Sequence, residues 1–335
     1  MSFAPTLCLV LLAVYGLASL ILSAALAIAW HAGLERTLAT SGDLLALRLL
    51  PAGGAALLVL TAALPAFLIY EPAHEAEHVG PLLVVLALFA LVAVGDGIRR
   101  AWRACSAARL LIDHWGPTHS WLVESGQKVD VVDLEEPIVA VVGGWRPRIL
   151  AARRVVAACS PEEFRRVIAH EAAHVSARDN LKLLLLVATP DALAWMPLGA
   201  ALAKRWRTAA EFAADERATG PDPHKRLALA SALIKVARLS TANDRTLPAL
   251  SMSVGVDDVA GRVRRLLAPS PDEFAAFPNA MRTRTAHAMG IAIAHAMRTT
   301  TAKMLTACAL LLPVIAVPLY GHVHEFIEVL VAFGR

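Results

Sequence analysis

The chain has 335 residues, of which 57% are hydrophobic and 18% are charged, and its mean hydropathy is +0.56. An average globular protein has about 25% charged and about 45–50% apolar residues, so this composition excludes a disordered chain and is too apolar for one soluble core. It indicates several membrane spans. The four cysteines show no paired spacing, which argues against a disulfide framework and against a cysteine zinc site.

Three apolar runs occupy the first third of the chain, at residues 4–30, 47–70 and 79–95. Each approaches the roughly 20 residues that a membrane-spanning helix needs. A fourth run covers residues 304–320. We therefore predict three transmembrane helices within residues 1–97, a last transmembrane helix within 304–322 and a short external tail at 323–335.

The charges are unevenly distributed along the chain. Residues 98–303 hold 29 of the 32 Lys and Arg residues but only 20 of the 28 Asp and Glu residues. Cationic segments stay on the cytoplasmic side of a membrane, so we expect residues 98–303 in the cytoplasm and both termini outside. Because the basic residues are interspersed with acidic ones, we expect membrane lipid and no nucleic acid as a partner.

The segment 98–303 begins with strand patterns and continues with helical ones. Two runs rich in β-branched residues, 129–133 and 138–142, lie between Gly and Pro residues, which is typical of strands. The second run is either an edge strand that pairs with an extended substrate or an interior strand. Further along, Arg262, Arg264 and Arg265 are expected to form a solvated or lipid-facing basic face.

A strong helix start precedes the most informative motif. Ser160 can cap a helix, Pro161 suits its first position, and Glu163 completes a capping box. His170 and His174 follow on this helix, four residues apart and therefore on one face, where both imidazoles can reach one ion. Glu171 lies beside them, placed to take a proton from a water molecule at the metal. This spacing is the zincin arrangement.

A second helical stretch supplies acidic residues. Zinc in a catalytic site takes three protein ligands and keeps one open position, and Glu211 is the candidate third ligand. Asp215 lies one turn later on the same face, where it can hydrogen-bond a ligating histidine, and we expect Asp179 to support the ligands as well. The alternative for Glu211 and Asp215 is a solvated acidic face.

The apolar segment 181–203 constrains the topology. If it crossed the bilayer once, Glu211 would lie about 30 Å from the two histidines, too far for a shared ion. Pro190-Asp191 interrupts the run near its middle. We therefore predict a re-entrant hairpin, or a pair of helices that lies in the membrane plane or is buried in the protein.

These motifs together resemble a known family. His170-Glu-Ala-Ala-His174, Arg178-Asp179-Asn180 and Glu211-Phe-Ala-Ala-Asp215 resemble the gluzincin membrane peptidases, and Gly144-Trp-Arg-Pro-Arg-Ile149 is similar to a segment of the BlaR/MecR-type peptidases. The resemblance implies a multi-span α-helical membrane protein with a cytoplasmic α+β zinc metallopeptidase domain. It also implies one Zn²⁺ per chain, held by His170, His174 and Glu211, with Glu171 as general base and a protein or peptide as substrate.

The resemblance further implies a bacterial-type inner membrane location and regulatory or signalling proteolysis. Sensor members carry an extracellular penicillin-binding domain after the last span, and we expect none here because the sequence ends at Arg335. Two alternatives stay open. One is an HtpX-like quality-control protease, and the other is a non-catalytic membrane receptor or scaffold that retains the fold. The sequence does not predict an oligomeric state.

Overall fold

The structure is a computed structural model that describes residues 3–34, 40–70, 80–115, 119–122, 128–134, 136–239, 251–253, 259–268 and 320–332. The chain divides into two compact units. The first comprises Met1–Leu26, Leu50–Ala93 and Pro269–Arg335, and the second comprises Ala27–Leu49 and Val94–Ala268. Each unit is described by itself.

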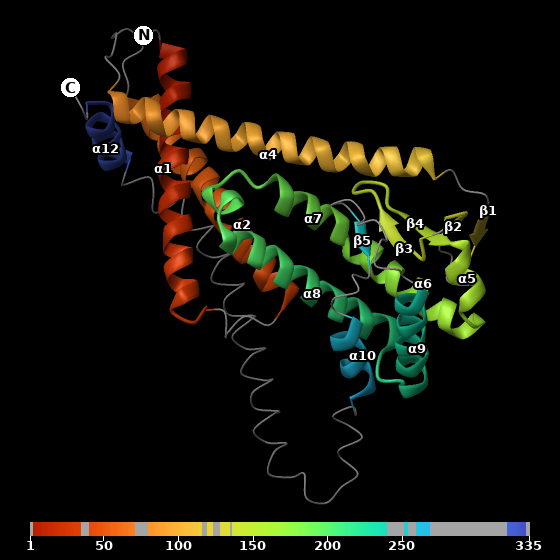
Figure 1. Cartoon of the computed structure of the whole chain (residues 1–335). Coiled ribbons are helices and arrows are strands. Elements are labelled where there is room, and N and C mark those ends of the chain that lie inside the picture. Colours follow the sequence, from red (N-terminus) through yellow and green to blue (C-terminus); the bar gives the residue numbers. More distant parts are fainter. Residues whose placement is uncertain are drawn as a thin grey trace, which may run out of the picture. The chain divides into compact units, whose positions relative to one another are not determined.

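Three helical stretches in the first third of the chain are long and apolar enough to cross a membrane, namely Ala4–His31, Ser41–Tyr70 and Pro81–Asp113. They correspond to α1 (Phe3–His31), to α2 (Ser41–Leu58) with the π-helical turn Val59–Ala63 and α3 (Leu64–Tyr70), and to α4 (Pro81–His114) (Figure 1). The prediction of three apolar helices is confirmed. The predicted fourth span at 304–320 lies almost wholly outside the described residues, and the predicted tail is helical, as α12 (Tyr320–Ala332).

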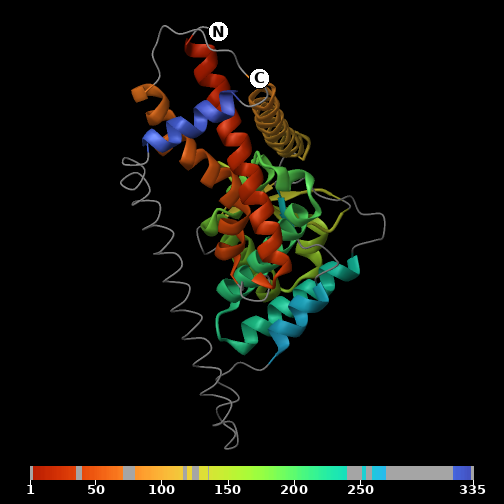
Figure 2. The same cartoon turned by 90° about the vertical axis from the view of Figure 1, so that its left-hand side faces the viewer.

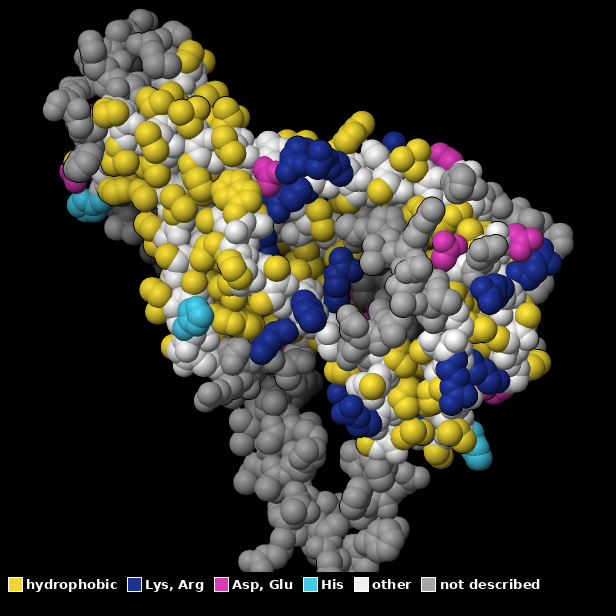
Figure 3. All heavy atoms as spheres, in the orientation of Figure 1, with side chains coloured by type: hydrophobic (Ala, Val, Ile, Leu, Met, Phe, Trp, Pro, Cys, Tyr) yellow, Lys and Arg dark blue, Asp and Glu magenta, His cyan; other side chains and the backbone are white. Residues whose placement is uncertain are grey.

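The core of the first unit joins α1, α3, the start of α4 and α12. Val10, Phe67, Leu83 and Ile327 are buried together there. Gly16 lets α1 approach α4 closely, because a Cβ at this position would lie 2.5 Å from the carbonyl oxygen of Leu86. Apolar side chains cover the surface over α1 and the start of α4, as a lipid-facing surface requires (Figure 3).

Helix α4 continues well beyond the apolar run that predicted it. The predicted span ended at residue 95 and the predicted domain boundary lay at 97, but the helix runs unbroken to His114. At 34 residues it is about 50 Å long, which exceeds the roughly 30 Å of a bilayer's hydrocarbon core. Its second half carries Ala104 and Ala108, one turn apart and both buried against the sheet of the second unit.

The second unit contains a five-stranded sheet of order β1-β2-β4-β3-β5. The strands are β1 (His119–Leu122), β2 (Lys128–Val132), β3 (Val139–Val142), β4 (Arg148–Ala152) and β5 (Ser251–Ser253). Among the strand pairs of the described residues, only β2–β4 is parallel. Both predicted strands are confirmed. The edge-strand interpretation of 138–142 is wrong, because β3 lies between β4 and β5.

The two faces of the sheet bury different partners. Val139 and Val141 point to a core shared with α6 and α9, whereas Ala140 and Val142 point to α4 and α7. This alternation follows from the two-residue period of a strand. The sequence of a strand that is covered on both faces is usually an unbroken apolar run, and Val-Ala-Val-Val in β3 is such a run.

The described residues of the second unit also form several helices. They are α5 (Arg153–Ala158), α6 (Pro161–Ala177), α7 (Asp179–Ala188), α8 (Pro197–Thr219), α9 (Pro223–Leu239) and α10 (Val259–Leu267). The predicted capping box is confirmed at the start of α6, where the Glu163 amide donates to Ser160 Oγ at 3.3 Å and the Ser160 amide donates to Glu163 Oε2 at 2.7 Å. Helices α9 and α10 lie side by side in both views (Figures 1 and 2).

The apolar segment 181–203 is divided between α7 and α8, so the predicted break at Pro190-Asp191 is confirmed. A turn and the 3₁₀ helix Ala192–Trp195 separate the two helices. The buried Asp191 carboxylate accepts two hydrogen bonds from Arg48 of α2, at 2.8 and 3.1 Å. Arg100 of α4 donates to the carbonyl oxygen of Thr189 at 3.0 Å, so two further helices hold this turn.

Candidate metal centre

Helix α6 carries the histidine pair in the interior of the second unit. His170, Glu171 and His174 are all buried, near the C-terminal end of the helix. The helix ends at Arg178, which has a left-handed backbone with φ of +54°. This sharp turn lets α7 start at Asp179 and directs the Asp179 carboxylate back toward His174.

Helix α8 packs against α6 and brings the acidic residues to the same place. Two arginines fix the relative position of the two helices, since each donates to a backbone oxygen of the other helix. Arg166 donates to the carbonyl of Ala218 and Arg217 to that of Ala173, both at 3.2 Å. Glu211 lies opposite the histidine pair as a result.

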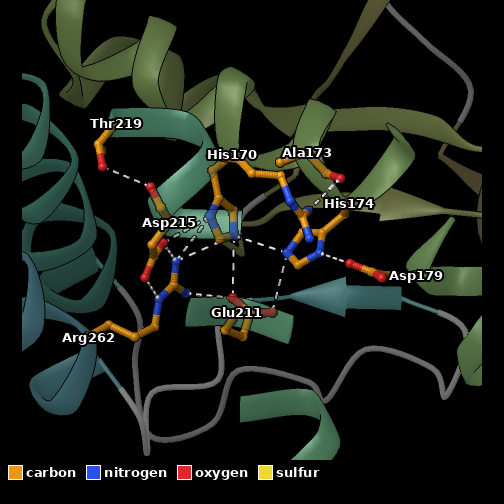
Figure 4. Close-up of polar contacts among 9 residues, drawn as sticks. His170, Ala173, His174, Asp179, Glu211, Asp215, Thr219 and Arg262 are labelled. Carbon is orange, nitrogen blue, oxygen red and sulfur yellow. Dashed lines mark hydrogen bonds and ion pairs between the residues drawn. The ribbon is translucent and has the colours of Figure 1, made fainter. Parts of the chain in front are cut away.

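The structure brings five of the predicted site residues together, namely His170, His174, Asp179, Glu211 and Asp215 (Figure 4), and the buried Glu171 interacts with the two histidines and Glu211. Asp215 Oδ1 lies 2.9 Å from His170 Nδ1, and Asp179 Oδ2 lies 2.8 Å from His174 Nδ1. With both Nδ1 atoms occupied, the two Nε2 atoms face each other at 3.1 Å. Carboxylates on the outer nitrogens orient the rings, an arrangement common around metal-ligating histidines, and Arg262 Nη2 lies 3.3 Å from the inner nitrogen of His170.

The three candidate ligands match the spacing that a metal ion demands. Glu211 Oε2 lies 3.3 Å from His170 Nε2, and Glu211 Oε1 lies 3.5 Å from His174 Nε2. In a tetrahedral site with bonds of about 2.0–2.1 Å, neighbouring ligand atoms are about 3.3 Å apart. His170, His174 and Glu211 are thus a group that can hold a metal ion, and two imidazoles with one carboxylate suit zinc.

The electrostatics of the group favour a bound cation. Burial acts to lower the pKa of His174, but its hydrogen bonds with Asp179 and Glu211 outweigh burial and raise that pKa to about 10. The pKa of His170 is also raised, because Asp215 and Glu211 outweigh burial and the charge of Arg262. The carboxylates therefore create a site of negative potential. One divalent ion can neutralise this charge in place of protons on the histidines.

Glu171 differs from the other carboxylates of the site. Burial raises its pKa to about 7, although the two histidines act in the opposite direction. Its Oε2 atom is buried and has no hydrogen-bond partner among the described residues. An orphaned buried oxygen beside a potential metal position is consistent with a group that acts on a water molecule there.

Arg262 of α10 is the residue of the site that the sequence interpretation missed. Its side chain is only 1% exposed and donates to Asp215 Oδ2 through Nε at 2.9 Å and to Asp215 Oδ1 through Nη2 at 2.5 Å. Its Nη1 atom forms an ion pair with Glu211 Oε2 at 2.8 Å. The prediction that it belongs to a solvated or lipid-facing face is wrong, whereas Arg264 and Arg265 are exposed. A signal was present, because Arg262 falls in the apolar stripe Val259, Val263 and Leu266.

The fold and site define a class of protein. In the described part of the chain, three helices are long and apolar enough to span a membrane, and the second unit buries a His-His-Glu group with Glu171 next to one of its histidines. Residues 127–266 match the family model described as BlaR1 peptidase M56. The resemblance predicted from the sequence is confirmed. Comparisons with curated proteins and with solved structures found no match.

Proposed function

We propose that the chain is an integral-membrane zinc endopeptidase that hydrolyses protein substrates at the cytoplasmic membrane face. One observation carries the proposal, namely the convergence of His170, His174 and Glu211, whose candidate ligand atoms lie within 4.8 Å of one another, inside the region that matches the peptidase family. The positive charge excess of residues 98–303 supports the cytoplasmic placement, with both termini outside. Regulatory or signalling proteolysis is the physiological role that the family resemblance supports.

The three ligands have distinct roles in this proposal. His170 and His174 offer their Nε2 atoms to zinc, while Asp215 and Asp179 hold the imidazoles in the required tautomer. Glu211 Oε2 forms an ion pair with Arg262 at 2.8 Å, so we assign Oε1, which lies 3.5 Å from His174 Nε2, to the ion. A bound zinc ion supplies Lewis acidity, which polarises a peptide carbonyl and makes a water molecule easier to deprotonate.

Glu171 acts as the general base and then as the general acid. Its carboxylate accepts a proton from the attacking water and delivers that proton to the nitrogen of the scissile bond. A base with a pKa near neutrality is well suited to both transfers, and burial brings the pKa of Glu171 to about 7. The surrounding apolar core excludes bulk water, which strengthens each electrostatic contact at the site.

The test pairs zinc content with proteolysis on the full chain in detergent. Wild-type protein and the variant Glu171→Ala are each expected to hold about one zinc per chain, but only the wild type should cleave unfolded casein. Glu162→Ala is the matched control, because Glu162 lies on the same helix and is half exposed, and it should cleave normally. Zinc binding without cleavage by the wild type would favour the scaffold alternative, and an absence of zinc would refute the site.

A further inference from the structure

A cavity of about 350 Å³ opens beside the histidine pair in the second unit. It is the approach to the candidate metal centre, because His174 forms part of its wall. The other walls come from the end of α6, the start of α7, strand β3 and the turn between β3 and β4. The lining residues include Val141, Trp145, Pro147, Val175, Arg178 and Asn180. Binding pockets for small ligands are usually about 300–1,000 Å³, so the cavity can enclose one large side chain.

The inner walls of this cavity are largely apolar, and an aromatic ring stands at its rim. Val141, Pro147 and Val175 contribute aliphatic surface. Trp145 is 80% exposed, and neither its ring nor its indole N–H has a partner among the described residues. The turn that carries Trp145 is set by Gly143, whose φ of +94° suits glycine. A tryptophan held out in this way can cover an apolar or aromatic group that enters the cavity.

Two polar groups in the cavity lining have unused hydrogen-bonding capacity. The Asn180 amide donates to the carbonyl oxygens of Val141 and Gly143, at 2.9 and 3.0 Å, which fixes its orientation. Its Oδ1 atom is buried and has no partner among the described residues. Arg178 is exposed, and within the described part of the chain its guanidinium has no ion-pair partner.

We propose that this cavity is a substrate subsite that receives a large apolar or aromatic side chain, while Arg178 binds a carboxylate next to it. The inference rests on the proposed function, since it places the subsite at the peptide bond to be cleaved. It selects substrates in which a bulky apolar residue adjoins an acidic group. Asn180 positions the turn that carries Trp145, and Trp145 closes over the bound side chain.

The experiment measures equilibrium binding and not cleavage, so that it stands apart from the test of peptidase activity. Zinc-loaded Glu171→Gln protein in detergent is titrated with fluorescent hexapeptides whose central pair is Phe-Asp, Ala-Asp, Phe-Lys or Ala-Lys. We expect Phe-Asp to bind at least tenfold more tightly than Ala-Lys, with each replacement weakening the binding. Amidated and free-acid forms of each peptide separate a side-chain carboxylate from a C-terminal one as the group bound by Arg178.

Two variants assign the preferences to residues. Trp145→Ala should lower the affinity for the Phe peptides about tenfold and leave the Ala peptides unchanged. Arg178→Glu should reverse the preference between Asp and Lys. Trp102→Ala and Arg165→Glu are matched controls at exposed positions on α4 and on the first half of α6, and they should change neither preference.

The outcomes for the subsite and for the peptidase are distinguishable. If the peptides do not bind, or if both preferences survive Trp145→Ala and Arg178→Glu, the subsite is refuted. If the preferences follow the variants while the wild type cleaves neither casein nor these peptides, the subsite stands and the proposed peptidase function fails. If the wild type cleaves casein while the variants leave the peptide preferences unaltered, the peptidase function stands and the subsite fails.

Discussion

Removing the guanidinium of Arg262 should destabilise the second unit by several kcal/mol. The side chain is buried, makes two charge-assisted hydrogen bonds to Asp215 and forms an ion pair with Glu211. Removing one partner of a buried ion pair typically costs about 3–5 kcal/mol, because the remaining charge is left uncompensated. We expect Arg262→Met to fall in this range for protein without metal. The buried carboxylates act to keep Arg262 charged, and its pKa is raised although burial opposes this.

A double-mutant cycle separates this contact from a general packing defect. Asp215→Leu combined with Arg262→Met removes both charges, and such a pair of apolar replacements is often neutral or even stabilising relative to the ion pair. The double variant should therefore be more stable than Arg262→Met alone, with a coupling energy of at least about 1.5 kcal/mol. Denaturant unfolding of the detergent-solubilised chain in the presence of a chelator measures each corner of the cycle.

The control uses the neighbouring exposed arginine on the same helix. Arg264→Met should change the free energy of unfolding by less than about 0.5 kcal/mol, as surface substitutions usually do. If Arg262→Met is as mild as Arg264→Met, or if the double variant is additive, the buried ion pair does not form and the reasoning is wrong. Zinc affinity provides a second readout, since loss of a group that orients ligands commonly costs about 10–100-fold.

Two further ion pairs yield predictions of the same kind. Hydrogen bonds from Lys235, Ser231 and the Ser160 amide outweigh burial and lower the pKa of Glu163 to about 2. The ionised carboxylate therefore stabilises the fold at pH values above its ordinary pKa of 4.5, and this stabilisation is lost as the pH falls toward 2. Glu163→Gln should therefore cost about 2 kcal/mol at pH 7 and almost nothing near pH 2, whereas Glu162→Gln should have little effect at either pH in thermal unfolding. Arg48→Leu should destabilise the chain by about 3–5 kcal/mol because it leaves Asp191 buried without its partner, and adding Asp191→Leu should restore much of that loss. A double variant no more stable than Arg48→Leu would show that the two side chains do not interact.

The sequence could predict the parts of the site that depend on local spacing. His170 and His174 share a helix face because of their four-residue interval, and the capping box at Ser160 sets where that helix begins. Glu211 and Asp215 lie one turn apart on α8 for the same reason. Helical periodicity is a property of a few consecutive residues, so it can be recognised without any knowledge of the tertiary fold.

The remaining features depend on contacts between distant segments. Arg48 and Asp191 are separated by 143 positions, and nothing local in either segment indicates the other. The length of α4 was underestimated because hydropathy records the apolar run and not the helix, which continues where Ala104 and Ala108 pack on the sheet. The position of β3 inside the sheet was likewise undecided by its sequence, because strand order is set by pairing with β5, more than 100 residues later.

The buried charges around the two histidines are suited to binding a divalent ion, whose positive charge would offset the excess of negative charge. Four buried carboxylates surround the pair, and Arg262 and the partly buried Lys182 supply two positive charges; the carboxylates are Glu171, Asp179, Glu211 and Asp215. The charge of Arg207 also acts on Glu211, so three positive charges face four carboxylates, and a net negative charge remains when all four are ionised. Protons on the imidazoles can neutralise it, which agrees with the raised pKa of each histidine, and a divalent ion can do so while leaving the imidazoles neutral. An isolated buried carboxylate is costly, so carboxylates gathered around two buried histidines suit a metal centre better than a solvated acidic face.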